Sequence, residues 1–213
     1  MTVTDIHSHH AAPYPEGIIS VSPEGVFTPV PGQYYSVGVH PWDTAGADDA
    51  ALEARMAAVE RLAAEPWVAA IGECGIDMLR GAPLFRQMNI FKRHVDLSLK
   101  VGKPLVIHCV KAHDVVIGVK KELAPGAGSP LWVVHGFRGK PTVARMLAAA
   151  GIGMSLGERF NAESLQTIPP ELLFAETDES KLTITQIIAA LSAAAGTDLQ
   201  PVIAGNVFSN FLQ

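Results

Sequence analysis

The chain has 213 residues, of which 48% are hydrophobic and 17% are charged, and its formal net charge is −5. This composition is typical of one globular domain over residues 1–213, and it excludes a long disordered tail or a coiled coil. The negative net charge excludes a general electrostatic attraction to nucleic acid or to an anionic membrane.

Three further absences in the sequence bear on where the protein works. The chain has no run of about 18 apolar residues that could span a membrane. Its first residues lack the basic patch and apolar stretch of a secretion signal. Its two cysteines, Cys74 and Cys109, are too few for a disulfide framework. We therefore expect a cytoplasmic protein with no membrane association, and no obligate protein partner is evident.

The first predicted strand covers residues 2–6 and leads directly into Asp5-Ile-His-Ser-His9. Because side chains alternate along a strand, His7 and His9 lie on the same side of it, about 6–7 Å apart. Two imidazoles in that arrangement can bind one metal ion. A single His-x-His pair is weak evidence for such a site, so the other ligands must come from the rest of the chain.

Strands and helices alternate along most of the remaining sequence. The two connections at residues 10–16 and 23–33 are rich in proline and glycine, which excludes full helices there. After the first strand, we predict strands at 17–22, 34–39, 67–72, 105–109, 131–134, 151–156 and 171–175. We predict helices at 48–65, 83–101, 113–123, 141–150, 183–195 and 201–212, with one short helical turn at 162–167.

Apolar strands separated by helices indicate a parallel sheet that is covered on both faces. With eight such strands, we predict a TIM-type (β/α)₈ barrel. The chain is short for this fold, which usually takes about 250 residues. We therefore expect a distorted barrel whose first crossover helices are missing or reduced. The alternative is an open, doubly wound sheet.

Six possible metal ligands stand at or just beyond the ends of predicted strands, where the active sites of parallel barrels lie. Four imidazoles and two carboxylates suit Zn²⁺, Mn²⁺, Fe²⁺ or Ni²⁺ better than Ca²⁺, with Mg²⁺ also a candidate. They can hold one or two ions, with Glu73 as the bridge, and the implied reaction is hydrolysis by metal-activated water. Asp178 is the candidate general base. The six ligands are His7, His9, Glu73, His108, His135 and Asp178.

Other residues near these strand ends could contact a substrate. His40 follows the third strand, and it could bind substrate or hold its own loop in place. Arg138 follows His135 and is a candidate phosphate contact. Trp42 is the one tryptophan placed to stack on a base.

Four more residues are predicted to support the structure, and a fifth is predicted to lie at the surface. We expect Asp5 and Glu176 to hydrogen-bond to ligating histidines, and Asp77 to cap its loop. His94, on a helix with polar neighbours, is predicted to lie at the surface. Asn206 is predicted either to cap the last helix or to pin a neighbouring loop.

A series of short motifs spans nearly the whole chain and resembles the TatD family of metal-dependent hydrolases, in a short variant. The resemblance implies a distorted TIM-type barrel, divalent metals at the six positions, and phosphodiester hydrolysis. It also implies a 3′→5′ deoxyribonuclease acting on single-stranded DNA ends. The motifs are Asp5-Ile-His-Ser-His9, Gly38-Val-His-Pro41, Ile71-Gly-Glu-Cys-Gly-Ile-Asp77, Ile107-His108, His135-Gly-Phe137, Met154-Ser155, Glu176-Thr-Asp178 and Asn206.

The chain departs from the family pattern at three places. It lacks the usual helix after the first strand. Val110 stands where the family often has an arginine. Lys111 could contact phosphate in its place, but a lysine ammonium is a point charge and lacks the bidentate hydrogen bonds of an arginine guanidinium. No proline follows Glu179, whereas the family commonly has one two residues after the aspartate of the Glu-Thr-Asp motif. These departures concern the surface that would bind a polymer.

Two other functions remain open from the sequence. An amidohydrolase-like enzyme acting on a small amide, lactone or phosphoester would use the same metal centre, and a closed pocket would favour it. A metal-binding or interaction module without catalysis would be indicated by a protein that binds no metal.

Overall fold

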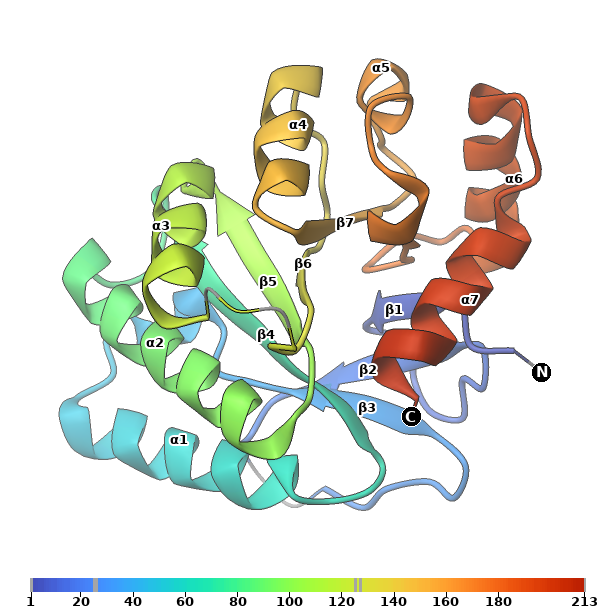
Figure 1. The fold of residues 1–213 in the computed structure, drawn as a ribbon. Helices are drawn as coiled ribbons and strands as arrows, with labels where there is room; N and C mark the ends of the chain where they lie inside the picture. The colour runs from blue at the N-terminus through green and yellow to red at the C-terminus, as the bar shows by residue number, and fades with distance from the viewer. Residues whose placement is uncertain (1, 25–26, 125, 127, 213) are drawn as a thin grey trace.

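In the computed structural model, which describes residues 2–24, 27–124, 126 and 128–212, the chain folds into a closed barrel of parallel strands (Figure 1). Each strand pairs with the next, and β8 pairs with β1 to close the barrel. This confirms the predicted barrel and excludes the open sheet. The strands are β1 (Asp5–Ser8), β2 (Gly17–Val21), β3 (Tyr34–Val37), β4 (Val68–Asp77), β5 (Leu105–Val110), β6 (Trp132–Val134), β7 (Ile152–Leu156) and β8 (Leu173–Ala175).

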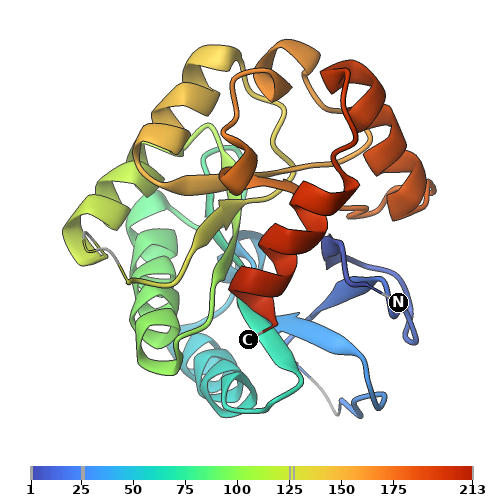
Figure 2. The ribbon, with the colours of Figure 1, turned by 45° about the vertical axis from the view of Figure 1, so that its right-hand side comes forward.

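Helices cover the barrel from β3 onward (Figure 2). Their bounds agree with the predicted ranges to within about two residues for the long helices. They are α1 (Asp49–Ala63), α2 (Leu84–Val101), α3 (His113–Leu123), α4 (Pro141–Ala149), α5 (Ala162–Leu165), α6 (Ile184–Ala195) and α7 (Gln200–Phe211), with short 3₁₀ helices η1 (Pro41–Thr44) and η2 (Pro170–Leu172).

Local sequence signals explain where these helices begin and end. The Asp48 carboxylate accepts a hydrogen bond from the Ala51 N–H at 2.8 Å and caps α1. Thr183 and Gln186 form a reciprocal capping box at the start of α6. Gly102 ends α2 in the left-handed conformation, at φ 70°. These signals are local, so the sequence was sufficient to locate the elements.

In the part of the chain that the structure describes, no single helix has the length and apolar character needed to cross a membrane. Only α6 and α7 taken together, across a bend of 120°, reach that length and composition.

The core lies both inside the barrel and between the strands and helices. Trp132 of β6 is fully buried, and its ring packs against Phe91 of α2 at 5.6 Å between centroids. Burying such a side chain stabilises the fold by roughly 1.5–3 kcal/mol. Packing of this kind fixes the helix-covered strands in place, and with them the residues at their carboxyl ends.

The first third of the barrel lacks helices, as the sequence predicted. The connections before β2 and before β3 are loops, although residues 25–26 of the second lie outside the described residues. Phe27 covers part of the outer face of β3, where its ring lies 4.8 Å from Tyr35 and 5.3 Å from Trp67. Aromatic side chains from a loop here do part of the covering that helices do elsewhere.

The prediction that the fourth strand ends at Gly72 is wrong, because β4 continues to Asp77. Gly72 and Gly75 both have positive φ angles, 146° and 142°, and a Cβ atom at either would collide with the backbone of β5. Pairing continues past them, with Gly75 opposite His108 and Asp77 opposite Val110. Glycines that suggested the end of a strand are instead what allows β4 to lie close to β5.

Candidate metal centre

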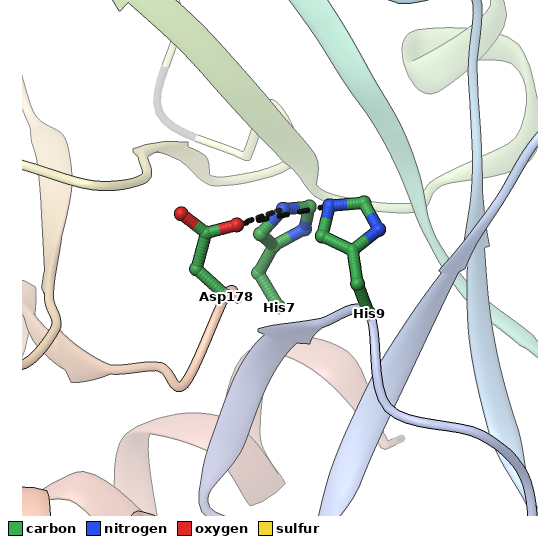
Figure 3. A group of neighbouring side chains, drawn as sticks. All are labelled: His7, His9 and Asp178. Carbon is green, nitrogen blue, oxygen red and sulfur yellow. Dashed lines mark ion pairs between the residues drawn. The ribbon is translucent and has the colours of Figure 1, made fainter. Parts of the chain in front are cut away.

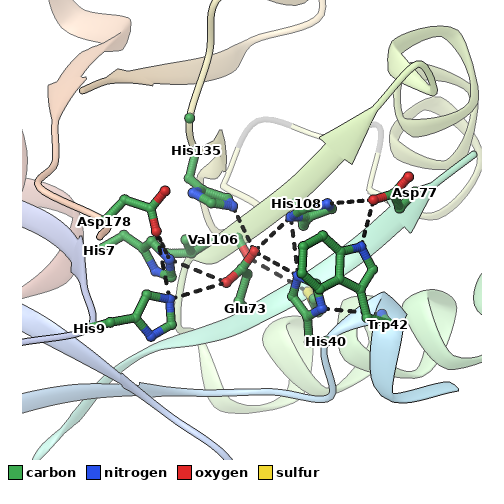
Figure 4. Close-up of polar contacts among 12 residues, drawn as sticks. His7, His9, His40, Trp42, Glu73, Asp77, Val106, His108, His135 and Asp178 are labelled. Carbon is green, nitrogen blue, oxygen red and sulfur yellow. Dashed lines mark hydrogen bonds and ion pairs between the residues drawn. The ribbon is translucent and has the colours of Figure 1, made fainter. Parts of the chain in front are cut away.

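Glu73 is the centre of the predicted site, and one of its carboxylate oxygens faces three imidazoles. Glu73 Oε1 lies 2.7 Å from His135 Nε2, 2.8 Å from His108 Nδ1 and 3.0 Å from His40 Nε2 (Figure 4). His108 lies in β5, and His135 directly follows β6. These strand ends therefore bring their side chains to one point, as the sequence predicted.

The other oxygen of Glu73 faces the imidazoles from the start of the chain. Glu73 Oε2 lies 3.3 Å from His7 Nε2 and 3.8 Å from His9 Nε2. Asp178 Oδ1 lies 3.8 Å and 3.7 Å from the same two nitrogens (Figure 3). All six residues predicted as ligands therefore lie together. His108 and His135 face one oxygen of Glu73, and His7 and His9, with Asp178 beside them, face the other.

The backbone fixes Asp178 beside β1. The Asp178 N–H donates a hydrogen bond to the His7 carbonyl at 2.9 Å, and the His9 N–H donates to the Asp178 carbonyl at 3.1 Å. Asp178 itself has φ 53°, a left-handed conformation that is unusual for a residue with a side chain. Strained residues of this kind are common at functional sites.

The donor atoms suit divalent transition metals. Four groups of three residues each offer ligand atoms that lie within 4.8 Å of one another, and Glu73 belongs to two of the groups. Both ring nitrogens of His7 are buried and have no hydrogen-bond partner among the described residues. A buried imidazole without a partner is costly, and coordination of a metal through one nitrogen would relieve that cost. Imidazole and carboxylate donors without thiolate fit Zn²⁺, Mn²⁺, Fe²⁺ or Ni²⁺.

The electrostatics of the cluster couple Glu73 to His135. Burial disfavours the Glu73 carboxylate, but His135 and His7 outweigh this and hold the pKa of Glu73 well below its usual value. Burial likewise disfavours a charged His135, but Glu73 and Glu176 outweigh it and raise the pKa of His135 well above its usual value. The protein thus keeps a negative charge at the point where the six residues meet.

Two carboxylates support the imidazoles on the β5 and β6 side. Asp77 Oδ2 lies 3.2 Å from His108 Nε2, and Glu176 Oε1 lies 3.4 Å from His135 Nδ1. With a metal ion on the nitrogen that faces Glu73, each of these carboxylates would accept the proton of the ring's other nitrogen and so fix the orientation of the imidazole.

Asp5 supports the β1 side in a different way. Its carboxylate accepts hydrogen bonds from the Thr177 hydroxyl at 2.6 Å, the Tyr14 hydroxyl at 3.2 Å and the His7 N–H at 3.2 Å. Burial raises the pKa of Asp5 to about 7, although these hydrogen bonds oppose the shift. The network ties β1 to the residue before Asp178.

A pocket of about 400 Å³ opens over the cluster. His40 and Trp42 line it, together with His9, Glu73 and His108. His40 thus stands where a substrate contact is predicted. Its Nε2 is also only 3.2 Å from His108 Nδ1, close enough to act with the ligands themselves.

The remaining predicted substrate contacts lie farther out. Arg138 is exposed and lines a second pocket, of about 380 Å³, which also includes Asp178. Lys111 is exposed just after β5, with φ 52°, and is not among the described residues that line the pocket over the cluster. The structure therefore places Arg138, but not Lys111, beside the site.

Three smaller predictions are corrected or extended. His94 is fully buried rather than at the surface, and its Nε2 accepts a hydrogen bond from the Val39 N–H at 3.0 Å. Asn206 lies within α7 and does not cap it, but its amide donates to the carbonyls of Pro170 and Leu173, which agrees with the predicted loop-pinning role. Asp77 caps its loop as predicted, through the N–H groups of the next residues, but its contact with His108 was not predicted.

Sequence comparisons agree with the motif series. A family model described as TatD-related DNase matches residues 28–186. A protein of Mycobacterium tuberculosis named as an uncharacterised metal-dependent hydrolase TatD is 36% identical over 163 residues, covering 70% of this chain and 59% of the relative. The 3′-5′ ssDNA/RNA exonuclease TatD of Klebsiella pneumoniae is 33% identical over 159 residues, covering 69% and 57%. The chain thus spans about three-fifths of the length of these curated relatives.

Solved structures agree with the fold. The crystal structure of YJJV, a TatD homologue from Escherichia coli K12, superposes with a TM-score of 0.75 at 19% identity and covers 99% of this chain and 97% of that one. A TatD-family hydrolase from Entamoeba histolytica gives a TM-score of 0.68 at 20% identity, covering 84% and 74%. These solved structures therefore share the barrel fold of this chain.

Proposed function

Because this chain belongs to the family of TatD-related DNases, we propose that it is a divalent-metal-dependent phosphodiesterase that removes nucleotides from the 3′ ends of single-stranded nucleic acid. The observation that carries the proposal is the division of the donors between the two oxygens of Glu73. His7 and His9 face one oxygen, and His108 and His135 face the other. A carboxylate in that position suits a bridge between two metal ions.

The ligands are assigned from this geometry. His7, His9 and Asp178 would hold one ion, and His108 and His135 a second, with Glu73 shared between them. The N and O donors suit Zn²⁺, Mn²⁺, Ni²⁺, Fe²⁺ or Mg²⁺. Ions bound there supply Lewis acidity, which lowers the pKa of coordinated water and stabilises charge on a phosphate.

The protein's own side chains have two further tasks. Asp178 lies at the junction of the two pockets, where its carboxylate can accept a proton from an attacking water. His40 is half-buried in the pocket wall, where its imidazole can donate a hydrogen bond to a phosphate oxygen or to the leaving oxygen.

The pocket volume supports a second candidate. A space of about 400 Å³ also suits a small molecule. An amidohydrolase-like enzyme that cleaves a small amide, lactone or phosphoester would use the same residues. We also propose a cytoplasmic location, since Cys74 and Cys109 are both free thiols.

The test is to incubate the purified protein with 3′- and 5′-labelled single-stranded DNA and RNA in Mg²⁺, Mn²⁺ or Zn²⁺. We expect nucleotides to be released from the 3′ end only when metal is present. Asp178→Asn should lower the rate by roughly 100-fold or more, the usual scale for losing an acid–base group. Asp114→Asn, an exposed acid on α3, is the matched control.

Two results would contradict the proposal. One is the absence of metal-dependent release from any nucleic acid. The other is an Asp178→Asn variant that is as active as the wild type. Hydrolysis of a small ester or amide in the same assay, with inert nucleic acid, would favour the second candidate.

A further inference from the structure

Positive charge is distributed unevenly over the face of the barrel that carries the metal centre. The sequence has no Lys or Arg before Arg55, so the connections that follow β1, β2 and β3 on this face carry none. By contrast, each of the five loops that follow β4 to β8 carries at least one exposed cation. These are Arg80, Lys111, Arg138, Lys140, Arg159 and Lys181.

These six cations differ from those on the helices in their partners. Arg86 of α2 pairs with Asp49 at 2.6 Å, Arg93 pairs with Glu53 at 2.6 Å, and Lys92 pairs with Glu122 at 2.8 Å. Among the described residues, none of the six loop cations lies within ion-pair distance of a carboxylate. They are therefore available to an anionic ligand, in a protein whose overall charge would repel one.

Three of the six surround the pocket of about 380 Å³ beside Asp178, namely Arg138, Arg159 and Lys181. Four acidic side chains also line this pocket, namely Glu158, Glu176, Asp178 and Glu179, and two of them are hydrogen-bonded. Glu176 accepts from the Gly136 N–H at 2.6 Å, and Glu158 accepts from the Ser180 hydroxyl at 2.7 Å. The three cations come from three different loops, so they can surround one anion from three sides.

This pocket adjoins the one over the metal centre. Asp178 and Glu179 line both. A chain molecule that passes through the metal centre can therefore continue directly into the second pocket. The two pockets differ in character, because the partly exposed Trp42, with the Arg80 guanidinium over its ring, lines the first, and three cationic side chains line the second.

We propose that Arg138, Arg159 and Lys181 bind a phosphate adjacent to the one that is cleaved, and that Arg80, Lys111 and Lys140 continue a phosphate-binding track along the loops after β4 to β8. The ligand is the backbone of a single-stranded nucleic acid, held by charge and not by base sequence. This inference rests on the proposed function, and it specifies a polymer rather than a small ester as the substrate.

The test compares two substrates that differ in their number of phosphates. One is (dT)₈, and the other is the p-nitrophenyl ester of thymidine 5′-phosphate, which has a single phosphate. The variant carries Arg138→Gln, Arg159→Gln and Lys181→Gln together. The control removes three exposed cations from helices on the outside of the barrel, through Lys100→Gln, Lys121→Gln and Arg145→Gln.

We expect kcat/KM for (dT)₈ to fall roughly 10-fold to 100-fold in the pocket variant, because three charge-assisted phosphate contacts are lost. The one-phosphate ester should change by less than about threefold, since its only phosphate is at the metal centre. The slope of log(kcat/KM) against log[KCl] for (dT)₈ should become shallower by about 0.7, the value for one neutralised phosphate of a single strand. The control should match the wild type.

The outcomes separate this inference from the proposed function. Suppose the wild type cleaves both substrates, and the pocket variant keeps its kcat/KM for (dT)₈ or loses kcat/KM equally for both substrates. The proposed phosphate-binding track is then wrong, while the proposed phosphodiesterase activity is supported. If the wild type cleaves neither, the proposed function fails. Binding of fluorescent (dT)₈, measured by anisotropy in Ca²⁺, still tests the track in that case, and equal affinity of wild type and pocket variant would overturn it.

Discussion

The two halves of the candidate metal centre are built from different parts of the barrel. His108 lies in β5, against which α2 and α3 pack, and His135 directly follows β6. His7 and His9 come from β1, in the third of the barrel that has no helices. Both halves end on the same carboxylate, that of Glu73.

The two halves are also supported differently. On the β5 and β6 side, Asp77 and Glu176 each contact the far nitrogen of an imidazole. On the β1 side, Asp5 contacts no imidazole nitrogen but binds backbone and hydroxyl groups. We infer that one half is oriented through its rings and the other through its backbone.

The loop before β2 contributes to that backbone support. The Tyr14 hydroxyl donates to Asp5, and the Tyr14 N–H donates to Gln33 Oε1 at 2.6 Å. The Gln33 amide in turn donates to the Gly17 carbonyl at 2.7 Å. Hydrogen bonds between two short loops therefore hold β1 and β2 where a crossover helix would pack in a fuller barrel.

The largest effect should come from breaking the link between the halves. Glu73→Gln removes the one charge that both halves share and leaves five imidazoles around a neutral amide. Breaking a buried charge contact costs about 3–5 kcal/mol, so we expect roughly 100-fold to 5,000-fold weaker metal binding and a comparable loss of activity. Bound metal measured by mass spectrometry, together with kcat/KM, checks this.

The control for Glu73→Gln is Glu163→Gln, an exposed acid on α5. It should keep both the metal content and the activity of the wild type. A Glu73→Gln protein that retains wild-type metal content would show that Glu73 is not a shared ligand.

A smaller effect should follow from changing one half only. Asp77→Asn replaces the acceptor behind His108 with an amide, which can no longer accept on both sides. Losing an outer partner of this kind typically costs about 10-fold to 100-fold in metal affinity. We expect titration to show one weakened metal and one unchanged metal. Asp96→Asn, an exposed acid on α2, is the control.

Equal weakening of both metals in Asp77→Asn would contradict the division into two halves. A fall in unfolding free energy without any change in metal binding would show that Asp77 acts only through its loop. Asp77 also accepts a hydrogen bond from Trp42 Nε1 at 2.6 Å, so Trp42→Phe should be measured beside it.

Much of this centre could be predicted because its signals are local. The apolar runs that end at His108 and His135 predict two strands, and they also predict that each histidine stands at the carboxyl end of its strand. The alternation of a strand placed His7 and His9 on one side. The same alternation, continued from Glu73 through Gly75, would have placed Asp77 beside the site, but Gly72 and Gly75 suggested that the strand had ended.

Other features depend on contacts between distant parts of the chain. The hydrogen bond from Tyr14 to Gln33 spans nineteen positions, and that from Thr177 to Asp5 spans 172. No periodic pattern marks either pair, because the pairing of β2 with β3 brings the first pair together and barrel closure between β8 and β1 brings the second together. His94 was predictable in principle, since it falls at helical spacing with the buried residues Ile90 and Phe91.

His94 links the two parts of the barrel, and it gives the last and smallest prediction. It lies on α2 and accepts a hydrogen bond from Val39, the residue before His40 at the end of β3. Burial lowers the pKa of His94 from 6.5 to about 4. Between these values the unfolded chain binds a proton that the folded protein does not, so the free energy of unfolding should fall as the pH is lowered.

The wild type should therefore lose up to about 3 kcal/mol of unfolding free energy through His94 between pH 7 and pH 4, in addition to the losses from other titrating groups. His94→Leu leaves the Val39 N–H without its acceptor, which costs about 1–3 kcal/mol at pH 7.5, but it removes the titrating group. Urea unfolding of both proteins from pH 7.5 to 4.5 should show their difference narrowing as the pH falls. A difference that stays constant with pH would mean that His94 is not held neutral by burial between α2 and β3.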